Sequence, residues 1–179
     1  MKTVIASDIH GSEKYCKSLL DAFEKSNADQ LILLGDIFYH GPRNPIPEGY
    51  APMEVNCLLE KICDKLIVLK GNCDSEVDAM IAPFTFSENC VLLSGGKKIF
   101  LSHGHVFNKD NMPKGNFHAV IYGHFHVGFI EKSNGTVIAN PGSISLPKGG
   151  TDRSYLVIEE NVISLLSLDG KLIKKTEIK

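Results

Sequence analysis

The stretch KTVIASDIH, residues 2–10, joins an apolar run to an aspartate and a histidine that are one position apart. The segment KTVIA has the apolar, β-branched character of a buried strand. Asp8 and His10 follow it directly, and carboxylate and imidazole groups are common ligands of divalent metals. Taken alone, the pair is better explained as a turn aspartate and a surface histidine. The rest of the chain decides between these interpretations.

The first half of the chain alternates strands and helices around this segment. Tyr15, Leu19 and Phe23 are four positions apart, which predicts an amphipathic helix over residues 12–27 with Ser12 as its N-cap. Further elements are strands at 30–34 and 65–69, a helix at 53–63, and a loop with four prolines at 35–52. This alternation is typical of a parallel or mixed sheet covered by helices.

The second half reads as short strands with little helix between them. These strands are predicted at residues 90–94, 98–102, 118–122, 136–140, 154–160 and 162–168. Asn134–Gly135 and Asp169–Gly170 are dipeptides of the kind that closes hairpins. With no linker between the halves, we expect a single domain over residues 1–179. Its predicted class is α/β, in an α+β layered form, with two mixed β-sheets packed face to face and flanked by helices.

Composition argues against several classes of protein. The formal net charge is -2, so we expect neither a nucleic acid nor an anionic membrane as partner. No apolar run approaches the roughly 18 residues of a membrane span, and the apolar start is too short for a signal peptide. The five cysteines form no C-x-x-C pair, so neither a disulfide framework nor a zinc finger is indicated. We expect a cytoplasmic protein.

Polar side chains of the metal-ligand type follow five of the predicted strands. Ligand sites in α/β folds form where the carboxyl ends of strands meet the loops, so these side chains should converge. Taken one at a time, each of these side chains has an ordinary explanation as a turn residue, a helix cap or a half-buried imidazole. These explanations do not account for the whole set, because four of the seven histidines of the chain occur at these strand ends. The candidate ligands are Asp8, His10, Asp36, Asn72, His103, His124 and His126.

The ordered series D-x-H, G-D, G-N-x-D, H-G-H and G-H-x-H resembles the calcineurin-like metallophosphoesterases, with a likeness from Asp8 to about Pro147. The segments 40–52, 71–78 and 140–150 look like the small bacterial YfcE-type phosphodiesterases in particular. The resemblance implies a four-layer sandwich with a dinuclear metal centre. It assigns one divalent ion to Asp8, His10 and His126, the other to Asn72, His103 and His124, and a bridging role to Asp36.

The chemistry of these donors agrees with such a centre. Imidazole, carboxylate and amide ligands without thiolate suit Mn²⁺, Fe²⁺, Zn²⁺, Co²⁺ or Ni²⁺, and the resemblance favours two Mn²⁺ ions. Ions about 3.5–4 Å apart need a shared carboxylate such as Asp36, and they activate a bridging hydroxide that attacks phosphorus. With that hydroxide, Asp8 and Asp36 counted, the centre keeps about one positive charge, which suits a monoanionic diester. We predict a phosphoric diester hydrolase that acts on small phosphodiesters.

One position departs from the wider family. Many members have a histidine in G-N-H-[DE] that is thought to protonate the leaving oxygen, and here that position is Cys73. A thiol is a poor substitute for imidazole, so we expect aryl leaving groups to be favoured over alkoxides. Cys73 is equally well explained as a small packing residue beside the metal. Asn72 and His105 are the other candidate catalytic residues; His105 either contacts phosphate or a supporting partner, or packs in its loop.

His40 and Arg43, in the proline-rich loop after Asp36, are the candidate substrate-binding residues. Arg43 either forks onto a phosphate oxygen or is an ordinary exposed arginine. Phe125, between the two histidines of G-H-x-H, is expected to point away from the ions and anchor the turn.

Two other functions are weighed against this one. A protein-binding scaffold similar to the eukaryotic retromer subunit has the same fold with a degraded metal site, whereas here every ligand position holds a competent donor. A metal-dependent nuclease needs basic surface to hold a polyanion, which the net charge does not supply. The resemblance also hints at a homo-oligomer.

Overall fold

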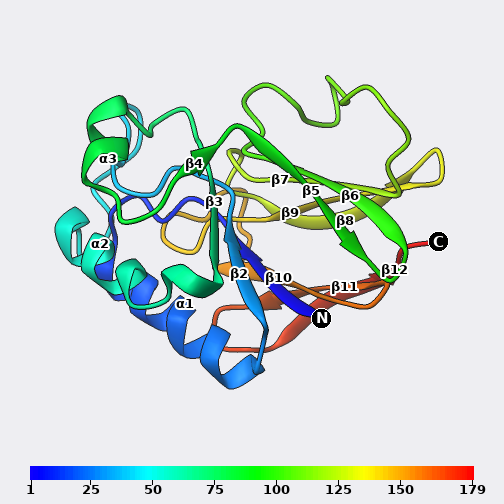
Figure 1. Ribbon diagram of the computed structural model, residues 1–179, viewed down its shortest axis with the longest axis horizontal. Coiled ribbons are helices and arrows are strands. Elements are labelled where there is room, and N and C mark those ends of the chain that lie inside the picture. The colour runs from blue at the N-terminus through cyan, green and yellow to red at the C-terminus, as the bar shows by residue number, and fades with distance from the viewer.

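The computed structural model describes residues 1–179 and contains two β-sheets stacked face to face, with helices against one of them (Figure 1). The seven-stranded sheet has the order β12-β11-β10-β1-β2-β3-β4. Its strands are β1 (Lys2–Ala6), β2 (Gln30–Leu33), β3 (Leu66–Leu69), β4 (Phe86–Ser87), β10 (Ser154–Glu159), β11 (Val162–Ser167) and β12 (Leu172–Glu177). Strands β1 to β4 are parallel and the others antiparallel.

The five-stranded sheet has the order β5-β6-β7-β9-β8 and is also mixed. Its strands are β5 (Asn89–Ser94), β6 (Lys97–Ser102), β7 (Ala119–Tyr122), β8 (Gly128–Ser133) and β9 (Thr136–Pro141). The helices are α1 (Glu13–Ser26), α2 (Pro52–Glu60), α3 (Glu76–Ile81) and a short 3₁₀ turn, η1 (Cys63–Lys65). Two mixed sheets face to face confirm the predicted fold class.

The core has two main layers because the strands of the seven-stranded sheet are buried on both faces. Along β1, Ile5 points toward the other sheet and contributes to the layer between the sheets. Its neighbours Val4 and Ala6 point the opposite way, toward α1 and α2. Successive side chains on a strand alternate between faces, so one short apolar run serves both layers.

Helix α1 covers the outer face of this sheet. Cys16, Leu19 and Phe23 form its buried stripe, at the spacing of one helical face. The Ser12 hydroxyl accepts a hydrogen bond from the Tyr15 amide and caps the first turn, as predicted. Asn27 ends the helix in a left-handed conformation.

Some elements differ from the sequence-based predictions. Helix α2 ends at Glu60, three residues before the predicted end at residue 63. The predictions lacked β4, β8, β12 and α3. Helices cover only the seven-stranded sheet, whereas Phe107 and Phe117, from the loop after β6, pack on the outer face of the five-stranded sheet. None of the helices has the length and apolar character that a membrane crossing requires.

The carboxyl ends of β1, β2 and β3 point in one direction, and the chain termini lie at the opposite end of the sheet (Figure 1). Near the N-terminus, the Lys2 ammonium lies 3.6 Å from a Glu159 carboxylate oxygen. Near the C-terminus, the Ile178 amide donates to the Asn161 carbonyl at 2.7 Å. Glu159 is the last residue of β10, and Asn161 is in the turn that leads to β11. Both chain ends therefore lie near this turn.

Candidate metal centre

The seven predicted ligands lie in loops that leave five strands, three in one sheet and two in the other. Asp8 and His10 follow β1, Asp36 follows β2 and Asn72 follows β3. From the five-stranded sheet, His103 follows β6, and His124 and His126 follow β7. Backbone hydrogen bonds continue beyond the strands: the His10 amide donates to the Asp36 carbonyl at 2.9 Å, and the Gly123 amide to the His103 carbonyl at 2.7 Å.

Asp8, His10 and His126 form a group that we call the inner cluster. The His10 Nε2 and His126 Nε2 atoms are 3.1 Å apart. Asp8 Oδ1 lies 3.2 Å from His126 Nε2 and 3.6 Å from His10 Nε2. All three side chains are buried. Their ligand atoms are close enough together to bind a single ion.

Asn72, His103 and His124 form a second group, the outer cluster. Asn72 Oδ1 is 3.0 Å from His103 Nε2, and His124 Nδ1 is 3.2 Å from the same nitrogen. His103 is buried, but His124 is half-buried and Asn72 is exposed. The outer cluster therefore opens toward solvent, whereas the inner cluster does not.

The carboxylate of Asp36 lies between the two clusters. Its Oδ1 atom is 3.4 Å from His103 Nε2, in the outer cluster. Its Oδ2 atom is 3.7 Å from His10 Nε2, in the inner cluster. One carboxylate thus presents a different oxygen to each cluster, as a bridging ligand would.

Three of the histidine rings are oriented by backbone carbonyls. The Nδ1 atom of His10 is 2.8 Å from the carbonyl oxygen of Tyr39. The Nδ1 atom of His103 is 2.8 Å from the carbonyl oxygen of Leu34, and the Nδ1 atom of His126 is 2.7 Å from the carbonyl oxygen of Leu146. A carbonyl only accepts hydrogen bonds, so Nδ1 carries a proton and Nε2 faces the cluster; whenever the ring is neutral, its lone pair is on Nε2. This is how histidine ligands are commonly held in metalloproteins.

The site also attracts positive charge. Burial by itself would lower the pKa of His103, but the hydrogen bond and the charge of nearby carboxylates raise it to about 9. Burial by itself would raise the pKa of Asp8, yet His10 and His126 hold it well below its usual range. Asp8 Oδ1 is buried and accepts no hydrogen bond. This oxygen lies 3.2 Å from His126 Nε2 and 3.6 Å from His10 Nε2, so a cation between the three atoms, either a ring proton or a divalent ion, would be stabilised there.

The backbone is strained at five of the seven candidate ligands. Asp8, His10, Asp36, His124 and His126 have φ between 50° and 66°, a left-handed region that costs a residue with a side chain about 1 to 2 kcal/mol. Such strain persists only where surrounding structure holds it, and it concentrates at functional sites. The tight loops explain the motif glycines, because a Cβ at Gly71 would overlap Asp36 and one at Gly123 would overlap Ser7.

Several side chains that the sequence analysis did not assign support these loops. The buried Asp74 carboxylate accepts hydrogen bonds from the amides of Asp36, Ile37 and Gly71 at 2.7–2.8 Å. Burial raises the pKa of Asp74 to about 6. The Asn140 amide group donates to the Gly123 carbonyl at 2.8 Å and so fixes the turn that carries His124. In the sequence, the only sign of a role for Asp74 is its position as the last residue of the G-N-x-D motif.

A cleft of about 410 Å³ lies over the outer cluster. It is lined by Asp36, Gly41, Arg43, Asn44, Pro45, Asn72, Cys73, His124, Phe125, His126 and Lys148. Lys148 was not predicted. Phe125 contacts Tyr122 and His124, is 45% exposed and lines the cleft.

The remaining predicted residues have different positions. Cys73 lines the cleft, and burial, followed by the negative charge of Asp36, raises its pKa to about 12. His105 is exposed beside His103, with ring centroids 5.4 Å apart, but does not line the cleft. His40 packs between Tyr39 and Tyr50 and supports the proline-rich loop from behind. The catalytic and substrate-binding roles of these residues stay predictions.

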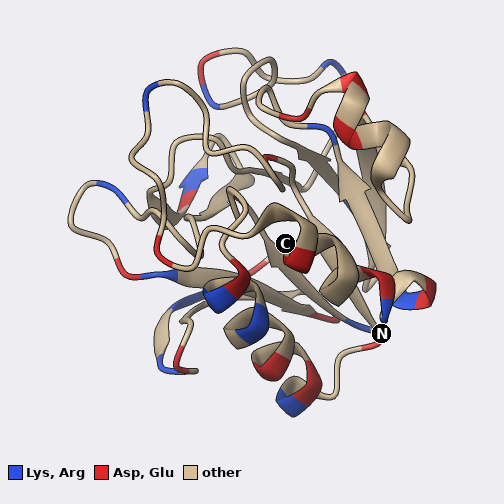
Figure 2. Cartoon of the chain, turned by 90° about the vertical axis from the view of Figure 1, so that its left-hand side faces the viewer, with Lys and Arg blue, Asp and Glu red and all other residues tan.

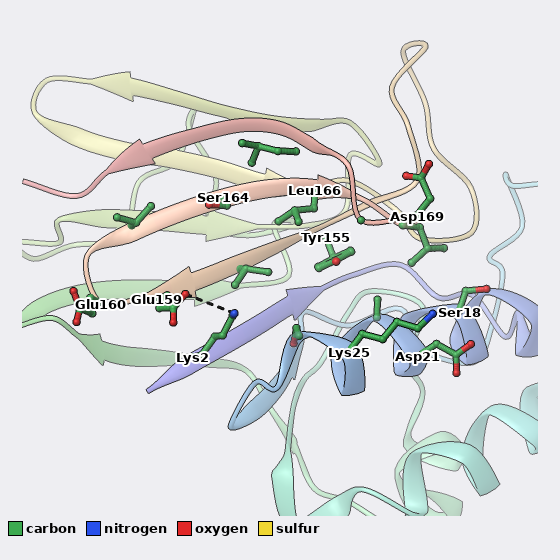
Figure 3. Close-up of a pocket in the computed structure, with 17 residues that line it drawn as sticks. Lys2, Ser18, Asp21, Lys25, Tyr155, Glu159, Glu160, Ser164, Leu166 and Asp169 are labelled. Carbon is green, nitrogen blue, oxygen red and sulfur yellow. Dashed lines mark ion pairs between the residues drawn. The ribbon is translucent and has the colours of Figure 1, made fainter.

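A larger hollow, of about 940 Å³, lies between α1 and the outer face of β10 and β11 (Figure 3). Lys25 and Asp21 project from the helix toward its rim, and Tyr155 and Leu166 form part of its floor. It contains no histidine or cysteine and none of the candidate ligands. It therefore lacks the mixed imidazole, carboxylate and amide donors of the predicted centre, and the smaller cleft is the candidate site.

The fold and this arrangement of donors are those of a metallophosphoesterase. The family model of the calcineurin-like phosphoesterase superfamily domain matches residues 1–161, and the chain belongs to this superfamily. The family prediction is thereby confirmed. The chain is 43% identical over 176 residues to Phosphodiesterase YfcE of Escherichia coli (strain K12), covering 97% of this chain and 95% of that protein.

Further comparisons agree on the family or the fold. A solved structure of YfcE, described as a phosphoesterase from E. coli, is 41% identical, covers 100% of both chains and has a TM-score of 0.96. Probable metallophosphoesterase YsnB of Bacillus subtilis (strain 168) is 29% identical over 88% of this chain and 83% of its own length. Vps29 of Entamoeba histolytica, solved with Zn²⁺, is 20% identical over 100% of both chains with a TM-score of 0.65, which shows the fold alone.

Proposed function

We propose that this protein is a phosphodiesterase that hydrolyses small phosphodiesters with two divalent cations held by the inner and outer clusters. Membership of the phosphoesterase superfamily and the 43% identity to a named phosphodiesterase support the reaction class. The observation that carries the proposal is Asp36, whose two carboxylate oxygens face different histidine clusters. A single-ion site has no need of such a carboxylate.

Two bound divalent cations supply Lewis acidity to the phosphoryl oxygens and lower the pKa of coordinated water. The protein's own contribution is orientation. The carbonyls of Tyr39, Leu34 and Leu146 hold three imidazole rings with Nε2 directed inward, so little reorganisation is needed. Asn72 contributes a neutral oxygen to the outer cluster, which leaves more positive charge facing the cleft than a carboxylate would.

Cys73 bears on the choice of leaving group. Its raised pKa keeps the thiol protonated near neutral pH, and a thiol with a pKa of about 12 is a weak acid toward a departing oxygen. We therefore propose that aryl diesters, whose phenolate leaves without a proton, react faster than alkyl diesters. Cys73→His should narrow the difference between the two.

The finer assignments belong to the same proposal. We propose Mn²⁺ as the ion, one domain over residues 1–179, and a cytoplasmic location with the five cysteines free. A small substrate is favoured over a nucleic acid because Figure 2 shows no basic stripe: basic and acidic residues are interspersed along α1, and α2 and α3 contain acidic residues but no Lys or Arg. A scaffold role would not require the full set of donor side chains.

The test is a metal-replacement assay. Protein stripped with a chelator should be inactive, and Mn²⁺ should restore hydrolysis of bis(4-nitrophenyl) phosphate. Asp36→Asn keeps the shape of the side chain but removes the charge between the ions, and it should lower kcat/KM by at least about 100-fold. A folded wild-type sample that turns over no diester with Mn²⁺, Zn²⁺, Co²⁺, Ni²⁺ or Fe²⁺ would contradict the proposal.

A further inference from the structure

The cleft over the outer cluster is more positively charged than a simple diester requires. Its lining includes Arg43 and Lys148, and Asp36 is its one carboxylate. Asp36 faces the metal clusters, and neither Arg43 nor Lys148 makes an ion pair. A monoanionic diester already balances the charge of the proposed dinuclear centre, so these two cations have no partner in that reaction.

Lys148 is held across the mouth of the cleft from both of its ends. Its backbone amide donates to the His126 carbonyl at 2.9 Å, next to the inner cluster. Its ammonium donates to Asn44 Oδ1 at 3.0 Å on the opposite wall. The Asn44 side chain in turn donates to the His40 carbonyl at 2.8 Å, within the loop that carries Arg43. These contacts place the Lys148 ammonium between the segment that follows His126 and the loop that carries Arg43.

Phe125 supplies a flat apolar surface to the same cleft. Its ring is 45% exposed although large apolar residues are usually buried. The His124 ring meets it edge-on at 5.1 Å between centroids, and the Tyr122 ring does so at 5.8 Å. These two contacts fix the ring and leave part of its surface free. Such a platform suits stacking of a base or another planar group, worth about 1 to 3 kcal/mol.

We propose that the substrate is a nucleotide-like phosphodiester that carries a second phosphate, with its planar base on Phe125 and its second phosphate at Arg43 and Lys148. This inference rests on the proposed function and adds the substrate class to it. Arginine and lysine are the side chains that bind phosphate best, by forked and point-charge contacts respectively. The cleft volume of about 410 Å³ is in the range of small-molecule sites, which admits a single nucleotide.

The test compares substrates that differ by one group. Thymidine 5′-(4-nitrophenyl phosphate) and its 3′-phosphorylated form share the scissile bond and the leaving group. With Mn²⁺ present, wild-type protein should have a kcat/KM about tenfold or more higher for the 3′-phosphorylated ester, because charged hydrogen bonds are the strong ones. Lys148→Met and Arg43→Met should each reduce that ratio toward 1. Lys175→Met, an exposed lysine on β12, is the matched control and should keep it.

Phe125 is tested with a different pair. Thymidine 5′-(4-nitrophenyl phosphate) should exceed methyl 4-nitrophenyl phosphate in kcat/KM by roughly fivefold or more in the wild type, and Phe125→Leu should remove that preference. Both substrates are assayed with the same enzyme preparation. A loss of folded protein or of bound metal therefore lowers both kcat/KM values by the same factor and leaves their ratio unchanged.

The outcomes separate the two proposals. Hydrolysis of all the diesters with no preference for the second phosphate, or with ratios that Lys148→Met and Arg43→Met leave unchanged, overturns the substrate class and leaves the phosphodiesterase standing. Failure to hydrolyse any of them, bis(4-nitrophenyl) phosphate included, overturns both. Calorimetry without turnover gives a second readout, in which thymidine 3′,5′-bisphosphate should bind about tenfold or more tightly than thymidine 5′-phosphate.

Discussion

The inner and outer clusters have similar donors but different surroundings. The inner cluster is at most 2% exposed at any of its three residues, and each has a left-handed backbone. In the outer cluster only His124 has that backbone, and Asn72 is exposed. The inner cluster thus lies in the packed interior and reaches the cleft only through His126, whereas Asn72 and His124 of the outer cluster line the cleft. We infer that the inner ion would organise the site and the outer ion would meet the substrate.

The largest expected effect comes from removing the charge of the inner cluster. Asp8→Asn keeps the size of the side chain, but replaces a buried carboxylate that faces two imidazoles. A direct ligand contributes no less than a supporting partner, so kcat/KM should fall by at least about 100-fold. Bound Mn²⁺, counted by elemental analysis after gel filtration, should fall from two ions per chain to one. Two retained ions would show that Asp8 is not a ligand.

The second effect concerns folding rather than activity. His126→Ala leaves the Leu146 carbonyl without its donor inside the protein, a loss of about 1 to 3 kcal/mol. His124→Ala removes a half-buried ring that donates to no backbone carbonyl. In urea unfolding of the metal-free proteins, His126→Ala should therefore be destabilised by about 2 kcal/mol more than His124→Ala. Equal losses would remove the distinction between the clusters.

A third test uses release of the metals. Asn72 is exposed and neutral, so the outer ion should be held less strongly than the inner ion, which has the Asp8 carboxylate. Zinc-loaded protein mixed with excess chelator and a zinc-sensitive dye should release its ions in two phases whose rates differ by about tenfold or more. Asn72→Asp should bring the phases together. A single phase in the wild type would contradict this expectation.

The smallest effect measures backbone strain. His124 has φ of 66°, a backbone conformation that glycine adopts without strain and alanine does not. In the metal-free protein, His124→Gly should be more stable than His124→Ala by about 0.5 to 1 kcal/mol, after allowing for the greater freedom of glycine in the unfolded chain. His105, which lacks a positive φ, is the control: there the glycine variant should be the less stable one. Thermal unfolding followed by circular dichroism provides the comparison.

Much of the fold was predictable because its central strands are apolar on both faces and its ligands follow those strands directly. The segment from β1 to His10 shows both features: an apolar strand, and the candidate ligands Asp8 and His10 close behind it. Strand β12 was missed because five of its six residues are exposed, so it lacks an apolar pattern. Helix α3 was missed because it has only six residues and buries none of them.

The parts of the site that escaped prediction depend on contacts across the fold. Asp74 supports the loop of Asp36 although 38 positions separate them. Lys148 reaches Asn44 over 104 positions. A ligand motif is local and can be recognised in a sequence, but a partner on the opposite wall of a cleft is defined only when the sheets have stacked.

The position of the chain ends has a practical consequence. Lys2 and Ile178 both lie at the turn between β10 and β11, a full strand length from the loops that carry the clusters. Immobilising the protein through either end on a bead or electrode would leave the cleft facing outward, toward the diesters in a flowing solution.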